Sequence, residues 1–209
     1  MIKGQVIRPT LQLKNIILPE WVAEEVQLGQ EVEDEAARMA IAIKLSNRQV
    51  KEGTGGPFGA IVCELGSGRV LGIGVNQVTN SCWSGAHAEF IAWTMAQEAI
   101  GSYDLGRDGA VGLYSSAQPC VSCWGGVFWT GISRLVFAAT KRDVEQYAGF
   151  DEGPLPSDWD VTLTKRGVSV ESGLLREEAV IALQEYGRLG GECYNSGYNP
   201  GSPRAGLNG

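Results

Sequence analysis

The chain has 209 residues, enough for one well-buried core and too few to require two domains. Its hydrophobic fraction of 44% and charged fraction of 20% are those of an ordinary globular protein. The net charge is −7 at pH 7, and no Lys/Arg cluster stands out. This charge balance argues against strong binding to the phosphates of a nucleic acid.

The first residues, MIKGQVIRPTLQLKNIILPEW, contain no apolar run long enough for the core of a signal peptide. No segment approaches the roughly 20 apolar residues that a membrane span requires. The five cysteines are sparse and odd in number, which argues against a disulfide scaffold. We therefore expect a cytoplasmic protein without a membrane partner.

The first half of the chain predicts an extension, a helix and a hairpin. Residues 1–30 are interrupted by two prolines, so we expect an N-terminal extension there. Apolar residues at helical spacing, with acidic residues in the first turn, predict a helix over 31–49. After a glycine-proline loop, apolar runs at 58–65 and 69–76 predict an antiparallel hairpin with a Gly-Ser-Gly turn.

Helical and strand patterns alternate after the hairpin. We expect helices over 86–100, from within 118–131, over 141–149 and over 174–189, with strands over 110–117, 133–140 and 167–173 and a loop at 150–160. A hairpin followed by this alternation predicts one α/β domain, a mixed sheet with helices on both faces. The end of the chain is rich in Gly, Pro, Ser and Asn and predicts a mobile tail.

Three residues have the chemistry of a zinc site. His87, the only histidine of the chain, opens a predicted helix, and the motif PCVSC places Cys120 and Cys123 at the start of the next one. A catalytic zinc takes three protein ligands of this kind and keeps a fourth position open for water. A helix N-terminus also favours the thiolate, which is the form that binds metal. One zinc ion per chain is the expected cofactor.

Glu89 lies two residues after the histidine and is not needed as a ligand. A carboxylate beside an activated water can take its proton and pass it on, so we expect Glu89 to be a catalytic acid/base. Other interpretations exist, because a lone histidine is usually a packing residue and a Cys-x-x-Cys can be a redox pair or half of a structural zinc site. The conjunction of both motifs at consecutive helix starts favours the catalytic interpretation.

The motifs HAE and PCVSC resemble those of the cytidine/deoxycytidylate deaminase superfamily of zinc enzymes. The stretches GGPFGAIV, GVNQV, HAEFIAW, PCVSCWGGVFWTGI and GFDEGP are similar to its guanine deaminase branch, including bacterial enzymes that accept ammeline. The resemblance implies a three-layer α/β/α sandwich with about five strands. It covers roughly residues 35–195, so we expect a deaminase domain over 31–195 and a flexible tail over 196–209.

The resemblance also implies roles for individual residues. Glu89 is the first proton shuttle, and Glu152, or less favourably Asp151, is the second acid near the exocyclic amine. Asn76 would hydrogen-bond the purine, and the backbone around Ala88 would contact the edge of the base. The expected ring contacts and the closing residue are Phe58, Trp129 and Tyr194 (or Asn195).

The reaction implied by this resemblance is hydrolysis of guanine to xanthine and ammonia, a step of purine catabolism. A homodimer is implied as well, with the C-terminal segment closing the active site of the partner subunit. Guanosine, a pterin, ammeline, cytosine or cytidine remain alternative substrates, and adenosine in transfer RNA is disfavoured by the acidic charge balance. A protein that keeps zinc and has lost the reaction is the alternative outside catalysis.

Overall fold

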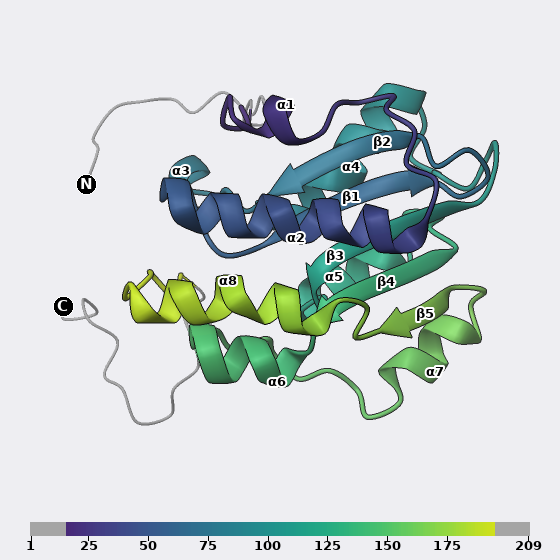
Figure 1. Ribbon diagram of the computed structural model, residues 1–209. Coiled ribbons are helices and arrows are strands. Elements are labelled where there is room, and N and C mark those ends of the chain that lie inside the picture. Colours follow the sequence, from purple (N-terminus) through teal and green to yellow (C-terminus); the bar gives the residue numbers. More distant parts are fainter. Residues whose placement is uncertain (1–15, 195–209) are drawn as a thin grey trace, which may run out of the picture.

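The computed structural model describes residues 16–194, which form a five-stranded mixed sheet between two layers of helices (Figure 1). The strands are β1 (Gly59–Glu64), β2 (Val70–Val75), β3 (Val111–Ala117), β4 (Arg134–Ala139) and β5 (Ser169–Ser172). The helices are α1 (Val22–Glu25), α2 (Glu35–Glu52), α3 (Val78–Ser81), α4 (Ala88–Ile100), α5 (Val121–Val127), α6 (Lys141–Asp143), α7 (Trp159–Thr164) and α8 (Arg176–Arg188), with a π-helical turn η1 (Val144–Ala148). The predicted α/β sandwich with an opening hairpin is confirmed.

The strand order is β2-β1-β3-β4-β5. β1 pairs antiparallel with both β2 and β3, whereas β3, β4 and β5 run parallel to one another. Because side chains alternate along a strand, Ile61 and Cys63 join the core on one face and Ala60 and Val62 the core on the other. Both faces are covered, which explains why these strands are nearly continuous apolar runs.

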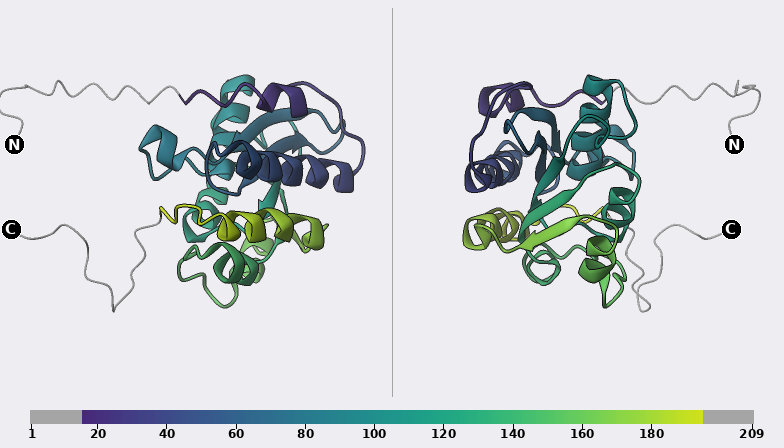
Figure 2. Two further views of the ribbon diagram at one scale, coloured as in Figure 1. Left: turned by 60° about the vertical axis from the view of Figure 1, so that its left-hand side comes forward. Right: turned by 90° about the vertical axis from the view of Figure 1, so that its right-hand side faces the viewer.

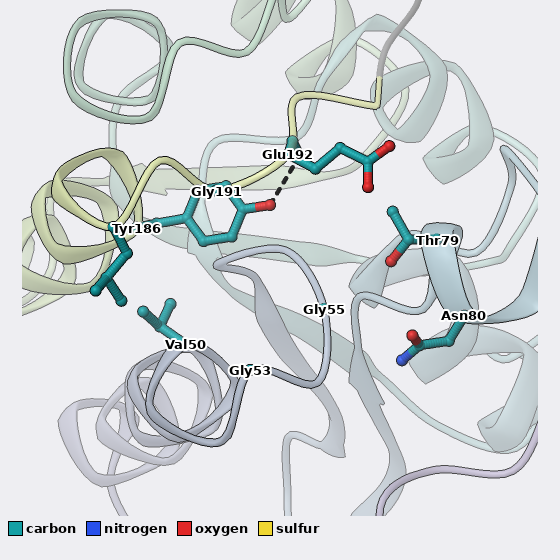
Figure 3. A pocket seen from close by; sticks show the side chains of 9 residues that line it. Val50, Gly53, Gly55, Thr79, Asn80, Tyr186, Gly191 and Glu192 are labelled. Atoms are coloured by element: carbon teal, nitrogen blue, oxygen red, sulfur yellow. Dashed lines mark hydrogen bonds between the residues drawn. The ribbon is translucent and has the colours of Figure 1, made fainter.

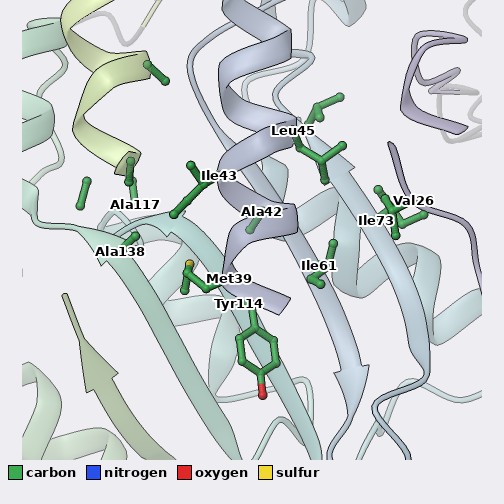
Figure 4. Close-up of a cluster of buried hydrophobic side chains, with 14 of the residues drawn as sticks. Val26, Met39, Ala42, Ile43, Leu45, Ile61, Ile73, Tyr114, Ala117 and Ala138 are labelled. Carbon is green, nitrogen blue, oxygen red and sulfur yellow. The ribbon is translucent and has the colours of Figure 1, made fainter. Parts of the chain in front are cut away.

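Helices α2 and α8 cover one face of the sheet, and α4 and α5 cover the other (Figures 1 and 2). Asp34 begins α2, since its side chain accepts a hydrogen bond from the Ala37 amide at 2.6 Å. From this helix Met39 and Leu45 pack on Ile61 and its neighbours in the sheet (Figure 4). The burial of this stripe holds α2 across the strands that lead to the site.

Two glycines of β2 bring α4 unusually close to the sheet. A Cβ on Gly72 would lie 2.0 Å from the Ala92 carbonyl oxygen, and one on Gly74 would lie 1.9 Å from that of Ala88. Only a residue without a side chain allows the helix backbone to rest on the strand in this way. The contact sets the depth and direction of the N-terminal turn of α4.

Several local features differ from the expected elements. α7 was not predicted, because its flanks are rich in Pro and Asp, and it is stabilised by packing of Trp159 on Phe137 at 5.8 Å. The expected helix over 141–149 is a short α6 followed by the π-helical turn. Trp21 and Val26, within the predicted extension, are buried in the core beside α2.

Residues 196–209, the predicted tail, lie outside the described residues. Among residues 16–194, no helix combines the length and apolar character that crossing a membrane requires. The described part of the chain consists of the sandwich and the loops at its edge, and the predicted site residues lie at that edge.

Candidate active site

Two helix N-termini bring the predicted ligands together. His87 is the N-cap of α4, and Cys120 is the N-cap of α5 with Cys123 in its first turn. The His87 Nδ1 atom lies 3.5 Å from the Cys120 Sγ atom and 3.4 Å from the Cys123 Sγ atom. The three donor atoms lie within 4.8 Å of one another.

These separations fit zinc. With Zn–N of about 2.0–2.1 Å, Zn–S of about 2.3 Å and tetrahedral angles, the nitrogen and each sulfur should be about 3.5 Å apart. The donor set of one imidazole and two thiols is also one that zinc prefers. His87, Cys120 and Cys123 therefore form a preformed three-ligand site, and a fourth position is left for water or substrate.

The ligands also influence one another's protonation. A hydrogen bond from the Cys123 thiol, with a further contribution from His87, lowers the pKa of Cys120 to about 4 against the effect of burial. Burial opposes protonation of His87, but Cys120 and the charge of Glu89 outweigh it and raise its pKa to about 9. Zinc requires a neutral imidazole and two thiolates, so its binding would release protons from His87 and Cys123.

Two buried carboxyl groups flank this centre. Burial, with the charge of Cys120 adding to it, raises the pKa of Glu89 to about 7 and that of Glu152 to about 8. Glu89 lies in the first turn of α4, and its carboxyl group is hydrogen-bonded to the Cys123 thiol. The Glu152 carbonyl oxygen accepts from the Val121 amide at 3.0 Å, which attaches its loop to the start of α5.

The neighbouring acid points elsewhere. Asp151 is exposed, and its carboxylate accepts a hydrogen bond from the Gly153 amide at 2.8 Å. Of this acidic pair it is Glu152 whose side chain is buried beside the ligands.

Asn76 and Tyr194 form a polar and aromatic wall of the site. The Asn76 side chain is buried, its Oδ1 atom accepts from the Val78 amide at 3.2 Å, and its Nδ2 atom donates to the Tyr194 hydroxyl at 2.5 Å. The Tyr194 ring centroid is 6.3 Å from that of His87. Ala88 is fully buried at the helix start, and Phe58 packs edge-on against Phe150 at 5.2 Å.

A turn after α8 places Tyr194 in this position. The Tyr186 hydroxyl donates to the Glu192 carbonyl oxygen at 2.8 Å (Figure 3), and the Cys193 thiol donates to the Ala148 carbonyl oxygen at 3.2 Å. Phe150 stacks on Tyr186 and contacts Tyr194, with centroid distances of 5.7 and 4.9 Å. Phe150 was not singled out from the sequence, and its position two residues before Glu152 was the only available signal.

Comparison with known proteins agrees with this geometry. Residues 32–139 match the model of the cytidine and deoxycytidylate deaminase zinc-binding region. The chain belongs to this deaminase family.

Two of the similar proteins are named guanine deaminases. The guanine deaminase of Bacillus subtilis is 34% identical over 127 residues, which are 61% of this chain and 78% of that protein. A structure of guanine deaminase from Nitrosomonas europaea has 38% identity and a TM-score of 0.79 over 84% of this chain and 96% of its own. The structure of NE0047 in complex with 2,6-diaminopurine has 40% identity and a TM-score of 0.80, and the match covers 86% of this chain and 95% of that chain.

Trp129, one of the two predicted ring contacts, lies on the surface of the protein. Its side chain is 82% exposed, one turn beyond Gly126, which packs against Trp93 of α4. A ring so exposed cannot flank a base within its own chain without moving, so its predicted role in substrate binding stays a prediction.

Proposed function

We propose that this deaminase hydrolyses guanine to xanthine and ammonia with one zinc ion per chain. The observation that carries the proposal is the placement of two buried carboxyl groups, Glu89 and Glu152, beside a preformed His-Cys-Cys triad. Structures of NE0047 with 2,6-diaminopurine, and of its variants with 8-azaguanine, support a purine as the substrate.

Each carboxyl group has a distinct task in this reaction. Zinc held by His87, Cys120 and Cys123 would supply Lewis-acid activation of water. The Glu89 carboxylate takes a proton from that water and delivers it to the ring nitrogen beside the amino-bearing carbon. The oxygen of water bonds to the amino-bearing carbon, and the Glu152 carboxyl donates a proton to the exocyclic amine, so that the C–N bond breaks and ammonia leaves. The hydroxyl left on the carbon becomes a carbonyl by giving its proton to the Glu152 carboxylate, which restores the starting state.

Asn76 supports a base that carries hydrogen-bond acceptors. Because its Oδ1 atom is engaged by the Val78 amide, its Nδ2 atom is the group directed toward Tyr194 and the site. With one N–H donating to the Tyr194 hydroxyl, the amide offers its second N–H to a ring nitrogen or carbonyl oxygen of guanine. The backbone at Ala88 and the ring of Phe58 would contact the edge and face of the base.

Tyr194 favours a small substrate over a folded RNA. It comes from the C-terminal turn of the same chain and lies beside His87, so the site is covered by its own chain. A covered site and a net charge of −7 both oppose binding of transfer RNA. Exchange of this segment between subunits stays a prediction.

We also propose that the protein is a homodimer. Ile17, Tyr103 and Trp129 are each more than 80% exposed, and a groove of about 900 Å³ runs along α4 between Trp83, Phe90 and Tyr103. Exposed apolar side chains beside a groove of this kind are a feature of interfaces between subunits. We expect the enzyme to act in the cytoplasm, in purine catabolism, where reducing conditions keep Cys120 and Cys123 available to zinc.

The proposed chemistry is tested by the variant Glu89→Gln, assayed for ammonia release together with zinc content. We expect full zinc occupancy and an activity loss of at least about 10²-fold, since a positioned acid/base contributes that much. Glu98→Gln, an exposed glutamate on the same helix, is the matched control. Equal activity of Glu89→Gln and wild type at equal zinc content would refute the role of Glu89.

The substrate is tested by an ultraviolet-monitored panel of guanine, guanosine, ammeline, a pterin, cytidine and adenine. We expect guanine to be turned over fastest. Turnover of cytidine without turnover of guanine would overturn the assignment. Deletion of the residues after Leu189 should impair turnover, because Tyr194 is lost with them, and sedimentation of the full chain tests the dimer.

A further inference from the structure

Two buried glutamines join the loops on either side of the site. The Gln49 Nε2 atom, from α2, donates to the Thr54 carbonyl oxygen at 3.0 Å and to the Asn76 carbonyl oxygen at 2.5 Å. The Gln77 Nε2 atom donates to the same two oxygens at 3.1 and 2.9 Å. Each primary amide has two N–H donors, so each can bridge two carbonyl groups at once.

The remaining atoms of this amide clamp, Gln49 and Gln77, are satisfied too. The Gln49 Oε1 atom accepts from the Thr54 hydroxyl at 2.9 Å, and the Gln77 Oε1 atom accepts from the side-chain Nδ2 atom of Asn80 at 3.1 Å. Gln49 is fully buried on the face of α2 that also presents Leu45, where an apolar residue would be the default. Because the Nε2 and Oε1 atoms of both glutamines all have hydrogen-bond partners, this network favours one position of the two loops relative to each other.

Packing alone does not hold the Thr54 loop. A cavity of about 260 Å³ lies against it, between Val50, Gly55, Asn80 and the C-terminal turn (Figure 3). On its inner side Gly55 approaches so closely that a Cβ would lie 2.2 Å from both the Asn76 carbonyl oxygen and the Gln49 amide nitrogen. The clamp therefore holds the loop from its inner side, together with the Trp21 indole, which donates to the Thr54 hydroxyl at 3.2 Å, and the Asn80 side chain, which donates to the Thr54 carbonyl oxygen at 2.7 Å.

The clamp acts on the residue that faces the substrate. Both glutamines hold the backbone carbonyl of Asn76, which leaves its side chain to bond the Val78 amide and the Tyr194 hydroxyl. A Cβ on Gly56, in the clamped loop, would lie 3.0 Å from the Tyr194 ring and 3.3 Å from Asn76 Cγ. One arrangement of amides thus sets the positions of two walls of the pocket.

We propose that Gln49 and Gln77 are positioning residues that direct the Asn76 amide toward the substrate. The proposal rests on the proposed function, in which Asn76 donates to the base. Loss of the clamp lets residue 76 rotate, so the base loses a hydrogen bond that is made in the ground state and the transition state alike. Such a loss raises KM and leaves kcat nearly unchanged.

The test is a double-mutant cycle of Gln49→Met with Asn76→Ala, assayed with zinc-loaded enzyme. Methionine matches the length of glutamine and lacks its donors. In the wild-type background we expect KM for guanine to rise about tenfold, as for one ordinary hydrogen bond, with kcat within about threefold. In the Asn76→Ala background the KM effect should vanish, whereas any loss in Tm should persist. Gln77→Met should behave in the same way.

Asn47→Leu is the matched control, since within residues 16–194 its side-chain amide donates to the Ile43 carbonyl oxygen of its own helix. An equal rise in KM for Gln49→Met in both backgrounds would overturn the proposal, because Gln49 would then act on something other than Asn76.

A crystal structure of Gln49→Met decides the question even if guanine proves not to be the substrate. Displacement of the Asn76 amide from the Tyr194 hydroxyl supports the clamp, and an unmoved amide refutes it. Absence of guanine turnover by the wild-type protein refutes only the proposed function.

Discussion

Replacing Gly74 by Ala tests how the fold positions the zinc site. The new Cβ would lie 1.9 Å from the Ala88 carbonyl oxygen, about 1.5 Å short of the 3.4 Å at which ordinary contact begins. The carbonyl belongs to helix backbone and cannot rotate away, so the N-terminal turn of α4 must move. Overpacking of this kind costs about 1–3 kcal/mol, which corresponds to a fall in Tm of roughly 2–12 °C for a chain of this length.

The same movement displaces His87 and Glu89, which belong to that turn. Misplacement of reacting groups by about 1 Å can reduce the rate about 10²-fold. We therefore expect Gly74→Ala to lose activity out of proportion to its stability, and to bind zinc more weakly. The measurements are zinc content, Tm and ammonia release on the purified protein.

Gly125→Ala is the matched control. Gly125 is in α5, the other ligand-bearing helix, and a Cβ there meets nothing within 4 Å. The control should keep its activity and gain about 0.5–1 kcal/mol of stability, as alanine does in a helix. If Gly74→Ala retained wild-type zinc content, Tm and activity, the direct contact between β2 and α4 would not be what places the site.

Three further predictions concern stability. The Glu35 carboxylate pairs with Arg134 and accepts from the Tyr114 hydroxyl, and these contacts, the Arg134 hydrogen bond first, hold its pKa below the usual 4.5. A lowered folded-state pKa adds stability that is present above the unfolded value of 4.5 and is lost as the pH falls through the folded value. Glu35→Gln should therefore cost about 1 kcal/mol in urea unfolding at pH 7 and progressively less as the pH falls below 4.5. Met39→Ala empties a fully buried site in the core and should cost about 2–5 kcal/mol, seen as a lower urea midpoint with an unchanged m-value. Removal of zinc by a chelator should lower Tm, and zinc at a thousandfold its Kd should restore about 4 kcal/mol; an unchanged Tm would contradict a site within the folded core.

The sequence alone determined the metal site and the class of fold. His87, Cys120 and Cys123 could be identified because each lies at a helix start, where local patterns are strong and a motif of few residues contains most of the geometry. The hairpin and the alternation of strands and helices were equally local, since apolar periodicity reports which face of an element is buried. Comparison with known proteins confirmed the family that these motifs indicated.

The tertiary structure decided how the residues around the metal contact one another. Tyr194 meets Asn76 across 118 residues of sequence, and Gln49 reaches the same asparagine from the far end of α2. Burial of Glu152 beside the ligands and exposure of its neighbour Asp151 follow from attachment of their loop to α5. Such contacts depend on where distant segments meet in space, and hydrophobic periodicity within one segment contains no information about its distant partners. The ligands of the zinc site are thus encoded locally, whereas the shape and polarity of its pocket arise only when the sandwich is assembled.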